Sequence, residues 1–273
     1  MTKRNIKQII IALIFFSILF ALVFLIYSIF IKPDPSCNDG IKNQEEEEID
    51  CGGPCLPCEL IHINNIEILS IKVIPSQDCF YDLVAQIKNP NQNYGSGNIS
   101  YKFELYDTQD NLISEYPGST YILPNQTKYI LKIKAESDIP VKQIKFSFIS
   151  VEWEKLEDYQ PPKLGVQQKE YRLLGDQEPG FSQARAILIN KTNFDFDKID
   201  IDILLFDSYD RLVGINTNEI RTFLADEERD FISIWFDTID GEVASFKIEV
   251  ETNIFNLDNY LSGIRDTERF QEY

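Results

Sequence analysis

The feature that most restricts the fold of this chain is a segment that occurs twice. The residues from Ala85 onward align with the residues from Ala186 onward, with one residue of slippage over the shared core. The aligned pairs are Asn89 with Asn190, Leu105 with Leu205, Tyr106 with Phe206, Asp107 with Asp207, Asp110 with Asp210 and Leu112 with Leu212. The spacing of about 100 residues between the copies is the size of one β-sandwich domain, so the repeat predicts two domains of one fold.

Apolar and polar residues alternate within each copy. Residues 99–105 and residues 199–205 carry an apolar side chain at every second position, and a turn-rich segment follows each of them. Alternation with a period of two is typical of a β-strand with one buried and one solvated face. We therefore expect an all-β region of two tandem immunoglobulin-like sandwiches, each with about seven strands and a core of its own.

The expected domain boundaries lie in segments that interrupt the alternation. Pro161 and Pro162 continue neither a helix nor a central strand, so they mark a linker between the two copies. The resulting division is a first sandwich at residues 60–156, a linker at 157–163, a second sandwich at 164–261 and a C-terminal tail at 262–273.

An uncharged apolar run precedes the repeats. Residues 9–31 contain no charged side chain, and as a helix they span about 34 Å against a hydrocarbon core of about 30 Å. A cleavable signal peptide has a shorter apolar region followed by a site of small residues, which this run lacks. A helix buried in a protein core is the alternative. We expect a transmembrane helix that contacts the lipid bilayer.

Basic residues indicate the orientation of this helix. Lys3, Arg4 and Lys7 lie before the apolar run, whereas Lys32 is the one basic residue at its far boundary. The positive-inside rule places residues 1–8 in the cytoplasm as a short tail and the chain after Lys32 outside the cell membrane. The sequence therefore predicts a single-pass protein with an extracytoplasmic C-terminal region.

The chain is strongly acidic, with a formal net charge of −18. Residues 1–36 hold four basic and one acidic side chain, so the remainder carries −21. A surface of this charge repels phosphate backbones, which argues against nucleic-acid binding. The acidic surface either keeps the protein soluble or attracts cations or a basic partner.

Four of the five cysteines lie together at Cys37, Cys51, Cys55 and Cys58, with the spacing C-x13-C-x3-C-x2-C. Outside the cell such cysteines form disulfides, and two bridges among four cysteines allow three pairings. Zinc binding and redox catalysis are the alternatives, although zinc sites more often have two close cysteine pairs. The fifth cysteine, Cys79, is expected to remain free as a buried thiol.

The residues between the cysteines resemble a short module, C-x-D-G-x-x-N-x-x-E-x-x-x-D-C-G-G-x-C-x-x-C, found beside domains of extracellular and surface proteins. The resemblance covers 22 residues, 37–58, and implies an extracytoplasmic, disulfide-stapled element without catalysis. We expect residues 33–59 to form a stapled neck. The matching positions are Asp39, Gly40, Asn43, Glu46, Asp50, Gly52, Gly53 and the four cysteines.

The neck also offers oxygen ligands of the kind that calcium prefers. Asp39, Asn43, Glu46 and Asp50 lie within 12 residues, although their spacing differs from that of an EF-hand loop. Calcium is therefore a candidate cofactor. The alternative is that the aspartates and asparagine cap turns while the glutamate is solvated.

The sequence "FELYD" at residues 103–107 resembles the FxLYD family of small immunoglobulin-like domains, which occur on membrane-anchored and surface proteins. The resemblance implies a binding or scaffolding role. It covers most of residues 65–155 and, more loosely, residues 165–255, where the motif itself is altered. The alternating pattern makes Phe103 and Leu105 core residues and Asp107 the start of a turn.

Motifs of catalysis are missing from the sequence. The one histidine, His62, lies outside any serine, cysteine or metal motif, and the chain has no phosphate-binding glycine loop. We therefore expect no enzyme, but a membrane-anchored surface protein whose two domains bind or scaffold an unknown protein partner. The alternatives are a structural subunit of a cell-envelope machine and a calcium-dependent adhesin or sensor.

Overall fold

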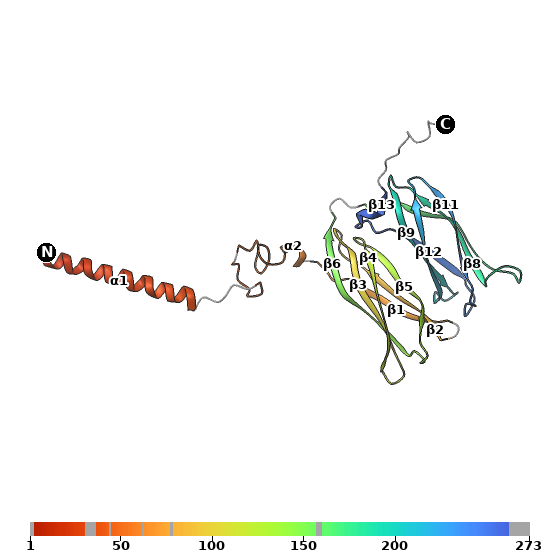
Figure 1. Ribbon diagram of the computed structural model, residues 1–273, viewed down its shortest axis with the longest axis horizontal. Coiled ribbons are helices and arrows are strands. Elements are labelled where there is room, and N and C mark those ends of the chain that lie inside the picture. The colour runs from red at the N-terminus through yellow and green to blue at the C-terminus, as the bar shows by residue number, and fades with distance from the viewer. Residues whose placement is uncertain are drawn as a thin grey trace, which may run out of the picture. The chain divides into compact units, whose positions relative to one another are not determined.

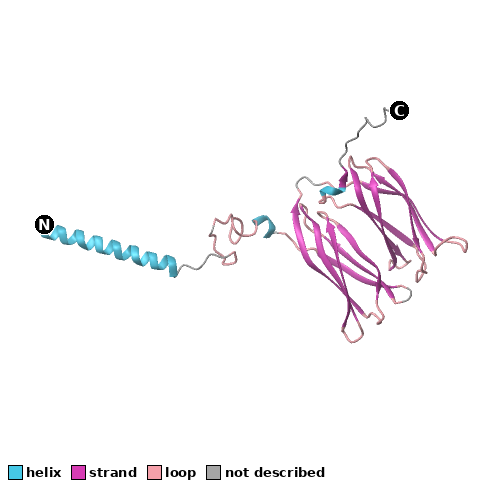
Figure 2. Cartoon of the chain, in the orientation of Figure 1, coloured by secondary structure: helices cyan, strands magenta, loops and turns pink. Residues whose placement is uncertain are grey.

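The computed structural model describes residues 3–30, 37–43, 45–61, 63–76, 79–156 and 160–261. His62, the start of the expected linker and the expected C-terminal tail lie outside these residues. The chain divides into two compact units, Met1–Ile63 and Asn64–Tyr273. Figures 1 and 2 show helix and loop in the first unit and almost only strands in the second, so the all-β class is confirmed for the second unit.

The first unit contains the helix α1 (Lys3–Phe30) and the single helical turn α2 (Cys58–Ile61). The large apolar side chains of α1 that the structure describes are 46 to 73% exposed. Judged by length and hydropathy over the described residues, no helix qualifies as a membrane-spanning segment. The membrane helix expected at residues 9–31 therefore stays a prediction from the sequence.

The first half of the second unit consists of two antiparallel sheets, which we call the N-terminal sheet pair. One sheet has the order β1-β2-β5 and the other the order β4-β3-β6. The strands are β1 (Glu67–Pro75), β2 (Phe80–Lys88), β3 (Tyr94–Tyr106), β4 (Leu112–Ile122), β5 (Thr127–Glu136) and β6 (Gln143–Lys155).

The second half forms the C-terminal sheet pair, with orders β7-β8-β11 and β10-β9-β12. The strand order is the same as in the N-terminal sheet pair, with β7 to β12 in the places of β1 to β6. The short strand β13 also pairs with β9, directly after the 3-10 turn η1. The elements are β7 (Leu164–Leu173), β8 (Ser182–Asn190), β9 (Asp195–Phe206), β10 (Leu212–Phe223), β11 (Glu228–Trp235), β12 (Ser245–Glu251), η1 (Leu257–Asn259) and β13 (Tyr260–Leu261).

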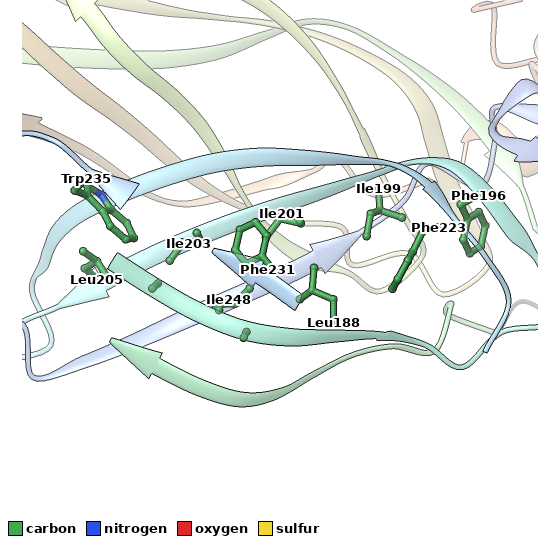
Figure 3. Close-up of a cluster of buried hydrophobic side chains, with 12 residues drawn as sticks. Leu188, Phe196, Ile199, Ile201, Ile203, Leu205, Phe223, Phe231, Trp235 and Ile248 are labelled. Atoms are coloured by element: carbon green, nitrogen blue, oxygen red, sulfur yellow. The ribbon is translucent and has the colours of Figure 1, made fainter. Parts of the chain in front are cut away.

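Each sheet pair encloses one apolar core, and alternation along the strands supplies it. In the N-terminal core Leu83 and Ile87 of one sheet meet Phe103 and Leu105 of the other, all four fully buried. The C-terminal core is built alike from Leu188, Ile201 and their neighbours (Figure 3). Burying each such side chain contributes about 1.5–3 kcal/mol, so these cores hold the sheets face to face.

The two sheet pairs also meet each other through their outer faces. Val84 of β2 and Leu204 of β9 are buried there, with Tyr129, Leu131 and other side chains packed against them. Residues that a single sandwich would leave in solvent are thus covered by the neighbouring pair. The sheets β1-β2-β5 and β10-β9-β12 form the two central layers of the second unit.

The number of strands differs from the expectation of about seven for each copy. Among the described residues the N-terminal sheet pair has the six strands β1–β6, and the C-terminal sheet pair has six and the two-residue strand β13. Three strands in each sheet are enough to enclose the core of each copy.

The repeat is visible in the hydrogen bonds as well as in the strand order. Asn89 and Asn190 are both fully buried, and each donates its amide N–H groups to main-chain carbonyls across its turn. Asp107 and Asp207 each accept two main-chain N–H groups of the following turn through Oδ1. Side chains that hold turns therefore recur at the aligned positions.

Candidate functional site

The cysteine segment is the candidate site of the first unit, and we call its described residues 37–58 the neck. Two disulfides are present there, as expected, and they join Cys37 to Cys55 and Cys51 to Cys58. The two closed loops overlap, because Cys51 lies inside the loop that the first bridge closes. This pairing is one of the three that the sequence left open.

Glu46 is the buried centre of the neck, with only 4% of its surface exposed. Its Oε2 atom accepts hydrogen bonds from the main-chain N–H groups of Asn43 and Asp50 at 3.1 and 3.2 Å. Its Oε1 atom lies 3.3 Å from Cys55 Sγ. A buried carboxylate is costly without hydrogen bonds, so these contacts make Glu46 an organiser of the two turns around it.

The other acidic residues of the neck hold turns in the same way. Asp50 Oδ1 accepts from the main-chain N–H groups of Asp39 and Gly40 at 2.9 and 3.0 Å. Asp39 Oδ2 accepts from Asn43 Nδ2 at 2.9 Å. Gly40 has φ of +72°, a conformation that glycine adopts without strain. The four residues expected to bind calcium therefore lie close together, but most of their hydrogen bonds are made to other groups of the neck.

The neck contains two groups of atoms close enough to hold a metal ion. They are Cys37, Glu46 and Cys55, and Glu48, Cys51 and Cys58, with ligand atoms within 4.8 Å of one another. In both groups the two sulfurs are joined to each other, whereas zinc binds deprotonated thiols. The oxidised neck therefore does not fit a zinc site. Asn43 Oδ1 is buried and has no hydrogen-bond partner among the described residues. A cation bound there would have to take its other ligands from carboxylates that now accept hydrogen bonds within the turns.

Calcium is expected to leave the neck unchanged. Because the carboxylates already accept main-chain N–H groups, calorimetry on the full chain in mild detergent should show no saturable heat when calcium is added. Glu46→Ala, by contrast, should destabilise the neck by about 1–3 kcal/mol, because two partly buried N–H groups lose their acceptor. Calorimetry measures the first effect, and hydrogen exchange of the neck measures the second. A saturable heat that Asp50→Asn abolishes would restore calcium as a cofactor.

Cys79 carries no disulfide, and its side chain is exposed. The expectation of a buried thiol was wrong. Cys79 lies in the turn directly before β2, with φ of +67°, and the first residue of the strand is Phe80. A turn residue in this conformation does not follow the alternation of the strand, so its side chain points to solvent rather than into the core.

The "FELYD" residues serve the fold. Phe103 and Leu105 are fully buried, and Tyr106 is half-buried with the Lys145 ammonium 4.2 Å from its ring centroid. Asp107 Oδ1 accepts from the N–H groups of Gln109 and Asn111 at 2.7 and 2.9 Å. The strand therefore places two core residues and ends in a capped turn, as its sequence indicates.

Sequence reasoning missed a set of carboxylates that the second unit partly buries between its sheet pairs. Asp200 and Asp202 of β9 pair directly with Glu251 and Glu249 of β12. Lys128 of β5 is only 4% exposed, and its Nζ atom lies 2.6 Å from Glu251 Oε2. In the sequence these residues have the pattern of a solvated face of a strand. Only the packing of one sheet pair against the other shows that they are partly buried.

Burial raises the pKa of Asp202 to about 7. The positive charge of Lys128 and a hydrogen bond from Thr217 lower this pKa, whereas the charges of Glu251 and Glu249 raise it. Burial also raises the pKa of Glu249, against the lowering effect of a hydrogen bond from Lys247. The contact between the sheet pairs thus holds a carboxyl that titrates near neutral pH.

Asp202 makes the stability of the second unit depend on pH. Because its pKa is higher in the folded than in the unfolded chain, its contribution is complete below about pH 4 and is lost as the pH rises through about 7. The loss is at most about 1.4 kcal/mol per pH unit. Urea unfolding of the full chain, followed by tryptophan fluorescence, should show this slope, and Asp202→Asn should remove it. Equal slopes in both proteins would contradict the assignment.

Comparison with known proteins assigns no family to the chain. No protein-family model matches the sequence, and no curated protein matches it either. The likenesses of residues 37–58 and 103–107 therefore remain resemblances of short motifs. What the structure itself defines is an all-β protein of two sheet pairs behind a disulfide-bonded segment.

Proposed function

We propose that this chain is a single-pass membrane-anchored surface protein whose two sheet pairs are tandem immunoglobulin-like domains that bind or scaffold a protein partner outside the cell. The observation that carries the proposal is the doubly disulfide-bonded neck, which in the chain follows a helix with a long apolar run and precedes the sheet pairs. Disulfides persist in oxidising compartments, so a neck that needs two of them belongs outside the cytoplasm.

The strand order supports the immunoglobulin-like assignment. In each sheet pair the first, second and fifth strands form one sheet and the fourth, third and sixth form the other, so three connections cross between sheets. Greek-key sandwiches of about 100 residues have connections of this kind. Such domains commonly offer edge strands and loops to partners, and in this chain no catalytic motif accompanies them.

Sequence and side-chain exposure support the anchor. Residues 9–31 are uncharged, and the described apolar side chains of α1 have no protein core around them. An apolar surface of this extent is unfavourable in water and favourable in lipid. With three basic residues before the apolar run, the proposed orientation has the N-terminus in the cytoplasm.

Cys79 provides the test of the proposed topology, because it is the one free cysteine and its thiol is exposed. Intact cells that express the full chain are treated with a membrane-impermeant maleimide. Labelling before permeabilisation that Cys79→Ser abolishes is the expected result. A second variant, Thr2→Cys in the Cys79→Ser background, should be labelled only after permeabilisation. Labelling of Cys79 only in permeabilised cells would overturn the proposal.

Partner binding is tested separately, by crosslinking on intact cells and extraction in mild detergent. A single exterior protein recovered with the chain supports the binding role. A fixed set of membrane proteins would instead favour the structural subunit of an envelope machine. Recovery of the chain alone, under conditions that preserve other surface complexes, would argue against both.

A further inference from the structure

A polar cleft of about 420 Å³ lies where the two sheet pairs meet. Its volume is in the range of small-molecule sites, about 300–1,000 Å³. Tyr101, Tyr121 and Lys128 line it from the N-terminal sheet pair. Asp202 and Thr217 line it from the C-terminal sheet pair. Both halves of the second unit therefore contribute to one cleft.

An ammonium group already occupies part of this cleft. Lys128 Nζ lies 4.0 Å from the centroid of the Tyr121 ring and 2.6 Å from Glu251 Oε2. A tyrosine face and a carboxylate are the two groups that stabilise a cation out of water. The Lys128 ammonium group is thus an example of how a primary amine is held at this cleft.

Two further groups of the cleft have no such partner. Tyr121 is 6% exposed, and its hydroxyl has no hydrogen-bond partner within bonding distance among the described residues, although burial, together with nearby carboxylates such as Asp200, raises its pKa. Asp202 accepts a hydrogen bond from Thr217 but forms no ion pair with a described residue. The other two cations of the cleft, Lys198 and Arg221, are paired with Asp200 and Asp197 at 2.9 Å each. A buried hydroxyl and a carboxylate without an ion-pair partner are therefore available to a ligand.

The sign of the charge decides what kind of ligand fits. The carboxylates that line the cleft, Asp197, Asp200, Asp202 and Asp258, outnumber its cations Lys128, Lys198 and Arg221, and the chain as a whole carries −18. A charged ligand is therefore drawn in as a cation. A metal ion fits less well, because among the described residues no three carboxylates of this cleft bring their oxygens within 4.8 Å of one another.

We propose that the cleft binds an aliphatic primary amine, with its ammonium group between the Asp202 carboxylate and the Tyr121 hydroxyl. The amine is either that of a free polyamine or that of a lysine side chain on a peptide. The proposal goes beyond the proposed surface function and does not depend on the membrane anchor, since all the groups involved lie in the second unit.

Binding is coupled to protons at this site. The groups that face Asp202 are Lys128 on β5, Thr217 on β10, Glu249 and Glu251 on β12, Tyr101 on β3 and Tyr121 on β4. Because the pKa of Asp202 is about 7, an incoming ammonium favours the ionised carboxylate and releases a proton. Affinity should therefore be higher at about pH 8 than at about pH 6.

Titration calorimetry of the full chain in mild detergent tests the proposal. The probes are cadaverine, spermidine and a lysine tripeptide with blocked ends, and the uncharged diol of the same length as cadaverine is the matched control ligand. Saturable binding of an amine, with no heat from the diol, is the expected result. Tighter binding of spermidine supports a free polyamine as the ligand, and tighter binding of the tripeptide supports a peptide lysine.

Variants connect the binding to the cleft. Asp202→Asn should lower the affinity about tenfold or more, because a charge-assisted hydrogen bond is lost. Tyr121→Phe should lower the affinity with little change in the melting temperature of the free protein, because its hydroxyl has no hydrogen-bond partner within bonding distance among the described residues. The matched control is Asp230→Asn, since this exposed carboxylate pairs with Arg185 on the sheet β7-β8-β11, away from the cleft.

Three outcomes would overturn the proposal. The first is the absence of saturable heat with every amine at low ionic strength. The second is equal loss of affinity in Asp202→Asn and Asp230→Asn, which would mean that amines bind the acidic surface at large. The third is binding of the diol as tight as that of cadaverine, which would make the cleft a site for neutral hydroxylated ligands.

Discussion

Replacing Cys37 and Cys55 by serine is expected to unfold the neck while the sheet pairs stay folded. These cysteines are 18 residues apart, and closing a loop of that length stabilises a chain by about 3 kcal/mol. Besides the second bridge, Cys51–Cys58, the neck is held by hydrogen bonds within its turns, and it buries few residues, among them Glu46 and Cys51. A loss of this size is comparable with all the stability that so small an element can have.

Hydrogen exchange with mass spectrometry of the full chain measures the effect. The amides of the neck should lose protection, whereas those of the strands from β1 onward should keep it, because the two units are separate compact bodies. Cys79→Ser is the matched control, since it removes an exposed thiol that forms no bridge. Unchanged protection in the neck would show that the turn network around Glu46 suffices. Loss of protection in the strands would show that the units are coupled.

Alternation of side chains was enough to predict the strands and the core. It places Phe103 and Leu105 inside, because a strand turns every second side chain to the same face whatever lies around it. The repeat aligned Asn89 with Asn190, but their role in holding turns became clear only from the hydrogen bonds. The turn at Asp107 was predicted from the residue type, because an aspartate side chain accepts N–H groups of the turn that follows it.

Properties that depend on packing between distant segments could not be predicted. The disulfide pairing requires the path of the neck in space, and the exposure of Cys79 follows from the conformation of a single turn residue. The carboxylates Asp202 and Glu249 look solvated in the sequence, since they alternate with core residues of their strands. Only the N-terminal sheet pair covers them, and the pattern of a single strand does not indicate that contact.

Asn190→Ala is expected to destabilise the C-terminal sheet pair by about 3 kcal/mol or more. Asn190 is fully buried, and its Nδ2 atom donates to the carbonyls of Phe194, Phe223 and Leu224 at 2.9, 3.2 and 2.9 Å. Its Oδ1 atom accepts from the N–H group of Thr192 at 3.0 Å. Alanine removes the partner of these main-chain groups, of which the Phe223 carbonyl is in a buried contact and the other three are in partly buried ones. Each buried group left without a partner costs about 1–3 kcal/mol.

Urea unfolding of the full chain measures this loss, because each sheet pair contains one tryptophan, Trp153 or Trp235. Trp153→Phe leaves the signal of the C-terminal sheet pair alone, and Trp235→Phe leaves that of the N-terminal sheet pair. The exposed neighbour Asn193 provides the matched control, since Asn193→Ala should change the stability by less than about 0.5 kcal/mol. If Asn190→Ala shifts both signals equally, the buried contact between the sheet pairs makes them one cooperative unit. If it shifts neither signal, the asparagine does not stabilise the turn. The hydrogen bonds shared by Asn89 and Asn190 would then contribute nothing measurable to the free energy of unfolding.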